Sequence, residues 1–143
     1  MSILNDIRPL PGKETATGGP EQFKKTVHLL IAEDEDSNYL LLRAILAEHN
    51  IHIIRARNGK EAVEICKSRH IDLVLMDIKM PVMDGFEATR QIRKLKPELP
   101  IIAQTAYTMS EEKERALTAG CDNYITKPLK SGELIELIKK YCC

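Results

Sequence analysis

From Thr26 onward the sequence alternates short apolar runs with longer segments in which apolar residues recur at helical spacing. The third and fourth runs, 71–76 and 100–104, are almost wholly apolar, as is typical of strands buried on both faces of a parallel sheet. Strand–helix alternation over five units predicts an α/β fold with one doubly wound, five-stranded parallel sheet and five helices. The expected strands are 27–32, 51–55, 71–76, 100–104 and 122–125.

Local signals place the helices between these strands. Asn58 followed by Glu61, and Asp84 followed by Glu87, are capping-box arrangements that predict two helix starts. Gly120 suits the left-handed position that follows the end of the fourth helix. The apolar stripe of the third helix is expected to bury Ala88, Ile92 and Leu95.

Residues 1–25 differ from the rest of the chain because prolines and glycines interrupt them and little periodicity is present. This composition predicts a linker or leader of mostly irregular structure. Residues 26–143 are expected to form one domain, in keeping with a total length of 143 residues.

The composition excludes several classes of function. With 21 basic and 21 acidic residues the net charge is zero, which gives no support to binding of nucleic acid or of a membrane surface. No apolar run approaches the roughly 18 residues of a membrane span, and no secretion signal is visible, so a cytoplasmic location is expected. The four cysteines form no CxxC pair and are interpreted as reduced thiols. Scattered histidines without the spacing of zinc ligands are interpreted as surface or boundary residues: His28, His49, His52 and His70.

Function in a doubly wound sheet lies beyond the carboxyl ends of the strands. There the sequence places carboxylates after the first and third strands, a hydroxyl after the fourth and an ammonium group after the fifth: Glu33, Asp34, Asp77, Thr105 and Lys127. Crowded carboxylates repel one another unless a cation lies among them. Because Mg²⁺ prefers oxygen ligands, the predicted ligands are Glu33, Asp34, Asp77 and the backbone carbonyl of Lys79.

The same residues suit phosphoryl transfer. Asp77 is expected to be ionised at neutral pH and can form an acyl phosphate without a general base. The metal, the Lys127 ammonium group and the Thr105 hydroxyl would each hold one of the three equatorial phosphoryl oxygens.

Several ordered blocks of this sequence resemble response regulator receiver domains, the chemotaxis-regulator-like module of two-component signalling. The matching blocks are IAEDE at 31–35, DLVLMDIKMPVMDG at 72–85, PIIAQTA at 100–106 and YITKP at 124–128. The resemblance covers roughly residues 26–143, essentially the whole structured part of the chain. It implies a flavodoxin-like sheet with strand order 2-1-3-4-5.

The resemblance also implies a role for each matched residue. Asp77 takes the position of the phosphoacceptor and Asp34 that of the main metal ligand. Glu33 stands at the other acidic position, where the family also commonly has Asp. Lys127 matches the phosphate-contacting lysine, and its bond to Pro128 is expected to be cis.

Switching is expected to depend on Thr105, which matches the family's switch hydroxyl, and on Tyr124, which matches its switch aromatic. Phosphorylation would draw Thr105 toward the phosphoryl oxygens and let Tyr124 turn inward, which changes the surface of the fourth helix, fifth strand and fifth helix. Lys79 and Tyr107 flank the site and could tune the access of water to an acyl phosphate.

The sequence AQTAY, with Tyr107 shortly after Thr105, resembles receivers carried by hybrid histidine kinases. This implies the receiver portion of a hybrid kinase, with a stand-alone regulator or phosphorelay intermediate as the alternative. The phosphodonor would be a histidine kinase, in cis or in trans, and the next acceptor a histidine-phosphotransfer protein. The receiver alone would catalyse only its own phosphorylation and dephosphorylation, whereas a parent hybrid chain would be a kinase.

Three other functions fit the residues less well. A haloacid-dehalogenase-type phosphohydrolase needs its nucleophile on the first core strand and a second Asp two residues later, where this chain has Lys79. A flavodoxin-like flavin binder needs a phosphate loop after the first strand, but 33–36 is acidic and would repel phosphate. A degenerate receiver that serves only as a docking surface would not need the intact set of Asp34, Asp77, Thr105 and Lys127.

Overall fold

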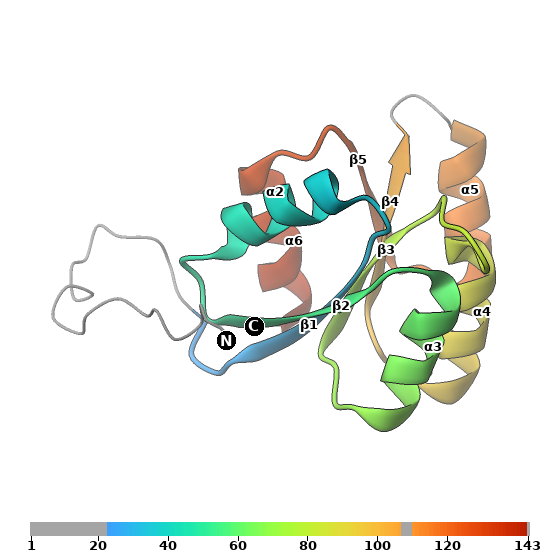
Figure 1. Ribbon diagram of the computed structural model, residues 1–143, viewed down its shortest axis with the longest axis horizontal. Coiled ribbons are helices and arrows are strands. Elements are labelled where there is room, and N and C mark those ends of the chain that lie inside the picture. The colour runs from blue at the N-terminus through green and yellow to red at the C-terminus, as the bar shows by residue number, and fades with distance from the viewer. Residues whose placement is uncertain (1–22, 107–109, 143) are drawn as a thin grey trace, which may run out of the picture.

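The computed structural model describes residues 23–106 and 110–142. They contain a five-stranded parallel sheet of order β2-β1-β3-β4-β5, which confirms the predicted fold class and strand order (Figure 1). The strands are β1 (Val27–Ala32), β2 (Ile51–Ala56), β3 (Leu73–Asp77), β4 (Ile101–Ala106) and β5 (Asn123–Lys127).

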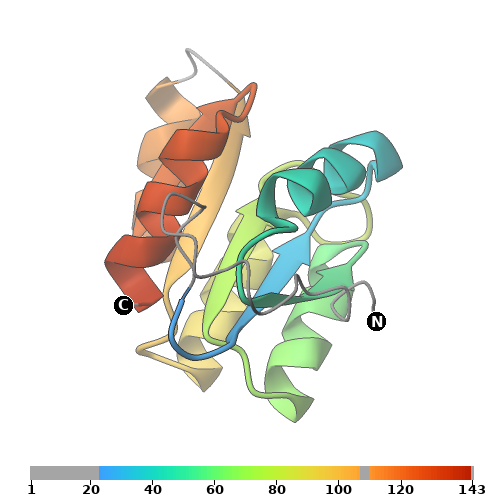
Figure 2. The same cartoon turned by 90° about the vertical axis from the view of Figure 1, so that its left-hand side faces the viewer.

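Helices cover both faces of the sheet (Figures 1 and 2). One face is covered by α2 (Asp36–Leu46) and α6 (Ser131–Cys142). The other face is covered by α3 (Gly59–Ser68), α4 (Gly85–Leu95) and α5 (Ser110–Ala119). None of the helices in the two described ranges combines the length and apolar character that a membrane span requires.

Two cores follow from the alternation of side chains along the strands. Leu30 and Ala32 of β1 face the core under α3, α4 and α5, whereas Leu29 and Ile31 face the core under α2 and α6. Every residue of β3 is buried, as the apolar character of that run predicts. Phe23, which precedes β1, packs against the second core, and its carbonyl accepts a hydrogen bond from the Asn50 side chain at 3.2 Å.

Both predicted capping residues are confirmed. Asn58 accepts the Glu61 amide hydrogen at 2.8 Å before α3, and Asp84 accepts the Glu87 amide hydrogen at 3.0 Å before α4. The predicted burial of Leu95 is wrong, because Leu95 is the last residue of α4 and its side chain lies 43% exposed beside a surface pocket. Ala88 and Ile92, one and two turns earlier, are buried as expected.

Four strands extend further toward their carboxyl ends than the apolar runs indicated, β2 by one residue and the other three into the functional residues. Asp77 is the last residue of β3, Thr105 lies within β4 and Lys127 ends β5. The parallel ladder continues through polar residues, since Asp77 is opposite Gln104 and Thr105 is opposite Thr126. Asp77, Thr105 and Lys127 are therefore held within the strands of the sheet, whereas Glu33 and Asp34 follow the end of β1.

A single arginine joins the end of α4 to the segment between α5 and β5. The Arg93 guanidinium donates to the carbonyl oxygens of Gly120 (2.6 Å) and Leu99 (2.7 Å) and to the Asp122 carboxylate (2.8 Å). Gly120 has a φ of 119°, in agreement with the predicted left-handed position after α5. We call this set of contacts the Arg93 clamp.

Candidate functional site

Four of the residues singled out from the sequence lie at the carboxyl edge of the sheet. The Lys127 Nζ lies 3.3 Å from Asp77 Oδ2 and 3.9 Å from Glu33 Oε1. Glu33 is fully buried and Asp77 nearly so. Carboxylate oxygens of Glu33, Asp34 and Asp77 all lie within 4.8 Å of one another. We call these three residues the acidic triad.

The donor set of the acidic triad fits a hard divalent cation. Glu33 Oε2 accepts the Glu35 amide hydrogen at 3.1 Å, but Glu33 Oε1 is buried and has no hydrogen-bond partner among the described residues. A buried carboxylate oxygen without a partner is costly unless a cation meets it. Three converging carboxylates are the ligands that Mg²⁺ takes, together with water.

Burial perturbs the ionisation of this group. Removal from water, and then the neighbouring Asp77 carboxylate, raises the pKa of Glu33 to about 7. Burial also raises the pKa of Asp77, although the Lys127 ammonium group acts in the opposite direction. One lysine therefore offsets only part of the cost of holding two buried carboxylates.

The turn between β3 and α4 fixes the position of Asp77. Its Oδ1 accepts the Lys79 amide hydrogen at 3.3 Å, and the Ile78 amide donates to the Gln104 carbonyl at 3.3 Å. Gly85 donates its amide hydrogen to the Ile78 carbonyl at 2.9 Å. A Cβ at Gly85 would overlap the Asp77 carbonyl oxygen, so this close approach requires glycine.

Thr105 and Tyr124 lie on neighbouring strands, as predicted. Thr105 is buried on β4, and its Oγ1 has no hydrogen-bond partner among the described residues. Tyr124 on β5 is partly buried against the core under α3, α4 and α5, and the Lys113 Nζ lies 5.2 Å from the centre of its ring. The Lys127–Pro128 bond is cis, as expected. Tyr107, the other predicted flanking residue, lies outside the described residues.

A buried glutamate near the site was missed by the sequence reasoning. Glu112 lies in the first turn of α5. Its Oε1 accepts the Ala106 amide hydrogen at 3.0 Å, and its Oε2 lies 3.6 Å from the Lys79 Nζ. The Lys79 side chain, predicted to flank the site, thus bridges the turn after β3 to the start of α5. No local pattern marks this contact, because it joins three separate segments.

Arg55 was also missed. Its guanidinium donates two hydrogen bonds to the Glu33 carbonyl, at 2.9 and 3.0 Å, and one to the Asp36 carboxylate at 2.9 Å. The Arg55 guanidinium carbon also lies 4.4 Å from the centre of the Tyr39 ring. These contacts fix the backbone of the acidic segment after β1. The signal that could have found them is the register of β1 and β2, which pairs Ile31 with Arg55.

The sequence profile of the response regulator receiver domain family matches residues 29–139. The chain is 35% identical over 128 residues to the sensor protein GacS of Pseudomonas syringae pv. syringae. The aligned region covers 86% of this chain but only 14% of GacS. The chain is 36% identical over 118 residues to the polar-differentiation response regulator DivK of Brucella ovis, which covers 81% of this chain and 96% of the relative.

Solved structures agree with the fold. The receiver domain of the sensor histidine kinase PA1611 from Pseudomonas aeruginosa, solved with a magnesium ion in its active-site cleft, has a TM-score of 0.77 and 32% identity, over 82% of this chain and 98% of that one. The receiver domain of Saccharomyces cerevisiae Ssk1, crystallised with the histidine phosphotransfer protein Ypd1, has a TM-score of 0.77 and 34% identity. The match covers 82% of this chain and 90% of that one. The chain therefore belongs to the response regulator receiver domains of two-component signal transduction.

Proposed function

We propose that this receiver accepts a phosphoryl group from a histidine kinase phosphohistidine onto Asp77 in a Mg²⁺-dependent reaction. The observation that carries the proposal is the convergence of the acidic triad, which includes Asp77, and the Lys127 ammonium group at one edge of the sheet. A structural ion pair would need neither the two additional carboxylates nor a buried Glu33 oxygen that no hydrogen bond satisfies among the described residues.

Asp77 supplies the nucleophile. One of its carboxylate oxygens attacks phosphorus, an O–P bond forms, and the P–N bond to the donor imidazole breaks. The electron pair of that bond stays on the imidazole nitrogen, so the products are an aspartyl phosphate and a histidine side chain. Lys127, already 3.3 Å from Asp77, remains as a fixed positive charge beside the transferred group.

Glu33, Asp34 and Asp77, with the backbone carbonyl of Lys79, would hold the Mg²⁺ ion, which when bound neutralises charge on the phosphoryl oxygens. Receivers in this family include one solved with magnesium in its cleft, which supports the assignment. Arg55 keeps the backbone of the segment after β1 in place, and the Asp77–Lys79 hydrogen bond orients the nucleophile.

The unpartnered hydroxyl of Thr105 is the proposed switch. On phosphorylation it gains an oxygen to which it can donate, and its movement vacates space toward which Tyr124 turns. The surface of α5, β5 and α6 then changes, which biases the receiver toward a second state. The surface that we propose a partner binds after phosphorylation therefore lies next to β5, the strand that carries Tyr124.

The proposed donor is a histidine kinase, in cis or in trans, and the proposed onward partner is a histidine-phosphotransfer protein. The similarity to a receiver of a sensor histidine kinase supports the hybrid-kinase origin. The match to nearly the full length of DivK favours the alternative of a stand-alone regulator or phosphorelay intermediate. We place the domain in the cytoplasm, where the free thiols of Cys66 and Cys121 stay reduced. The sequence on either side of residues 1–143 decides between the two origins.

Phosphorylation of Asp77 is tested by incubating the chain with acetyl phosphate and Mg²⁺ and measuring its intact mass. The parent chain is expected to gain one phosphoryl group and Asp77→Asn none. Asp84→Asn is the matched control, because asparagine caps a helix as well as aspartate does, and it is expected to be labelled like the parent. Undiminished labelling of Asp77→Asn would place the acceptor elsewhere.

The switch is tested with beryllofluoride, a mimic of the phosphoryl group. Crystal structures with and without it are expected to differ in the Tyr124 rotamer and in the partner of the Thr105 hydroxyl. A Thr105→Val variant should bind the mimic without moving Tyr124, because valine keeps the shape of threonine but lacks the hydroxyl. Identical Tyr124 rotamers in the parent's two structures would contradict the switch.

A further inference from the structure

Two histidines and an aspartate meet at the amino edge of the sheet, away from the acidic triad. His28 is near the start of β1, whereas His70 and Asp72 precede β3. Along β1, His28 and Glu33 are five residues apart, which is about 17 Å of strand. The cluster is therefore separate from the proposed phosphorylation site, and nothing in the proposed function uses it.

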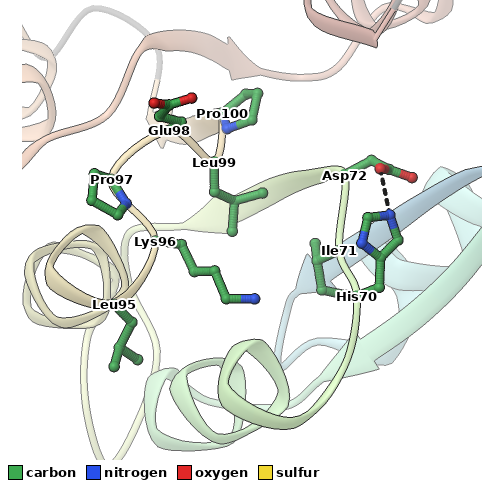
Figure 3. Close-up of a pocket in the computed structure, with 9 residues that line it drawn as sticks. All are labelled: His70, Ile71, Asp72, Leu95, Lys96, Pro97, Glu98, Leu99 and Pro100. Atoms are coloured by element: carbon green, nitrogen blue, oxygen red, sulfur yellow. Dashed lines mark hydrogen bonds and ion pairs between the residues drawn. The ribbon is translucent and has the colours of Figure 1, made fainter.

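The three side chains already face one another. His28 Nδ1 lies 3.3 Å from Asp72 Oδ2, and His70 Nε2 lies 2.8 Å from Asp72 Oδ1. One ligand atom from each residue lies within 4.8 Å of the others. Figure 3 shows His70 directed at Asp72 along one rim of a pocket of about 500 Å³, into which Lys96 extends from the opposite side.

The backbone holds two of these residues in fixed positions. The His28 amide donates to Asp72 Oδ2 at 2.8 Å, and the Asp72 amide donates to the His28 carbonyl at 2.8 Å. This reciprocal pair anchors His28 and Asp72 on adjacent segments of the sheet. His70 is different, because its side chain is 72% exposed and can adjust its position.

The donor set indicates a borderline divalent transition metal. Neutral imidazole nitrogens and one carboxylate oxygen are ligands that Zn²⁺ takes readily, whereas Mg²⁺ prefers oxygen alone. Ligand atoms around a tetrahedral Zn²⁺ are roughly 3.3 Å apart, given metal–nitrogen distances of about 2.0–2.1 Å. His28 Nδ1 is already at that separation from Asp72 Oδ2, whereas the exposed His70 now faces the other oxygen, Oδ1, and would move toward both.

We propose that His28, His70 and Asp72 form a second metal site, which binds Zn²⁺ with the remaining positions filled by water. On binding, each imidazole presents a lone pair at the nitrogen that now faces Asp72 and carries its proton on the other ring nitrogen. His52, the cross-strand neighbour of His28 with a ring 5.6 Å away, adds a further imidazole beside the site. The sequence reasoning missed the cluster because His28 and His70 are far apart along the chain.

The test is calorimetric titration of the full chain with ZnCl₂ in excess Mg²⁺, which occupies the acidic triad. Cys142→Ser and Cys143→Ser form the background, because adjacent thiols would chelate zinc on their own. One Zn²⁺ per chain is expected, with shifts of the His28 and His70 ring resonances in ¹H–¹⁵N spectra. His70→Ala is expected to weaken binding about tenfold or more, by comparison with the loss seen when supporting residues of metal sites are removed.

His49→Ala is the matched control, because His49 lies beside Phe23 on the other face of the sheet, and it should leave zinc affinity unchanged. Asp72→Asn keeps an acceptor for the His28 amide while removing the charged ligand, so it should fold and bind zinc weakly. Equal zinc affinity in the parent, His70→Ala and Asp72→Asn would overturn the proposal. Absence of any shift in the two ring resonances at saturating zinc would do the same.

Discussion

Glu33 is a fully buried carboxyl group that lies beside a second buried carboxyl group, Asp77. Its folded-state pKa of about 7 lies above the ordinary value of 4.5. Between these two values the folded state binds more protons than the unfolded state does. The free energy of unfolding therefore falls as the pH rises through this window, whenever no metal is bound.

We expect this fall to be on the order of 1–3 kcal/mol between pH 4.5 and pH 7 in the presence of EDTA. Urea unfolding at a series of pH values measures it. Glu33→Gln should flatten the profile, because glutamine has the same shape and no charge to bury. Glu133→Gln, at an exposed position of α6, should keep the slope of the parent. A flat profile for the parent chain would contradict the assignment.

At the scale of single residues, sequence reasoning located Glu33 and Asp77 because each directly follows an apolar run, where a parallel sheet places its functional groups. Lys127 was located in the same way, two residues after the fifth expected strand. It did not locate Glu112 or Arg55. Both act through contacts between segments that are distant along the chain, and each looks locally like an ordinary charged residue of a helix or strand.

Within the described part of the chain, a buried side chain joins the start of α5 to the end of β4. Glu112 accepts the Ala106 amide hydrogen and pairs with the Lys79 ammonium group. Ala106, which donates to Glu112, directly follows Thr105 on β4. Glu112 therefore provides one side-chain contact between α5 and the strand that carries the proposed switch hydroxyl.

Glu112→Ala is expected to destabilise the domain by about 1–3 kcal/mol, because it leaves the Ala106 amide without its acceptor. The exchange of that amide hydrogen should accelerate in hydrogen-exchange NMR. Glu112→Gln is the control, since its carbonyl oxygen can still accept the bond, and it should retain most of the protection. Equal exchange rates in the parent and in Glu112→Ala would show that this contact does not hold the amide.

At the scale of elements, the sequence predicted the five strands and the caps of α3 and α4 because their signals are local. The strand ends were set too early at Asp77, Thr105 and Lys127. Hydrophobicity stops where the buried polar residues begin, but the backbone ladder continues past them. The burial of Leu95 was predicted wrongly because periodicity alone does not reveal which residue ends a helix.

The molecule as a whole is expected to be stabilised by magnesium, since an ion held by the acidic triad binds only the folded chain. At a free concentration about 100 times its dissociation constant, the gain is about 2.7 kcal/mol. Thermal unfolding with increasing MgCl₂ measures it. Asp34→Asn should reduce the shift in midpoint, whereas Asp84→Asn, outside the triad, should not. A midpoint independent of magnesium at every concentration would contradict the site.

The Arg93 clamp has a consequence for how α5 can move. It ties Gly120 and Asp122, at the carboxyl end of this helix, to the frame formed by α4, whereas the first turn is held through Glu112 to the end of β4, beside the proposed switch. Any displacement that starts beside Thr105 should consequently rotate α5 about its carboxyl end, with the largest movement near Ser110 and the smallest at Gly120.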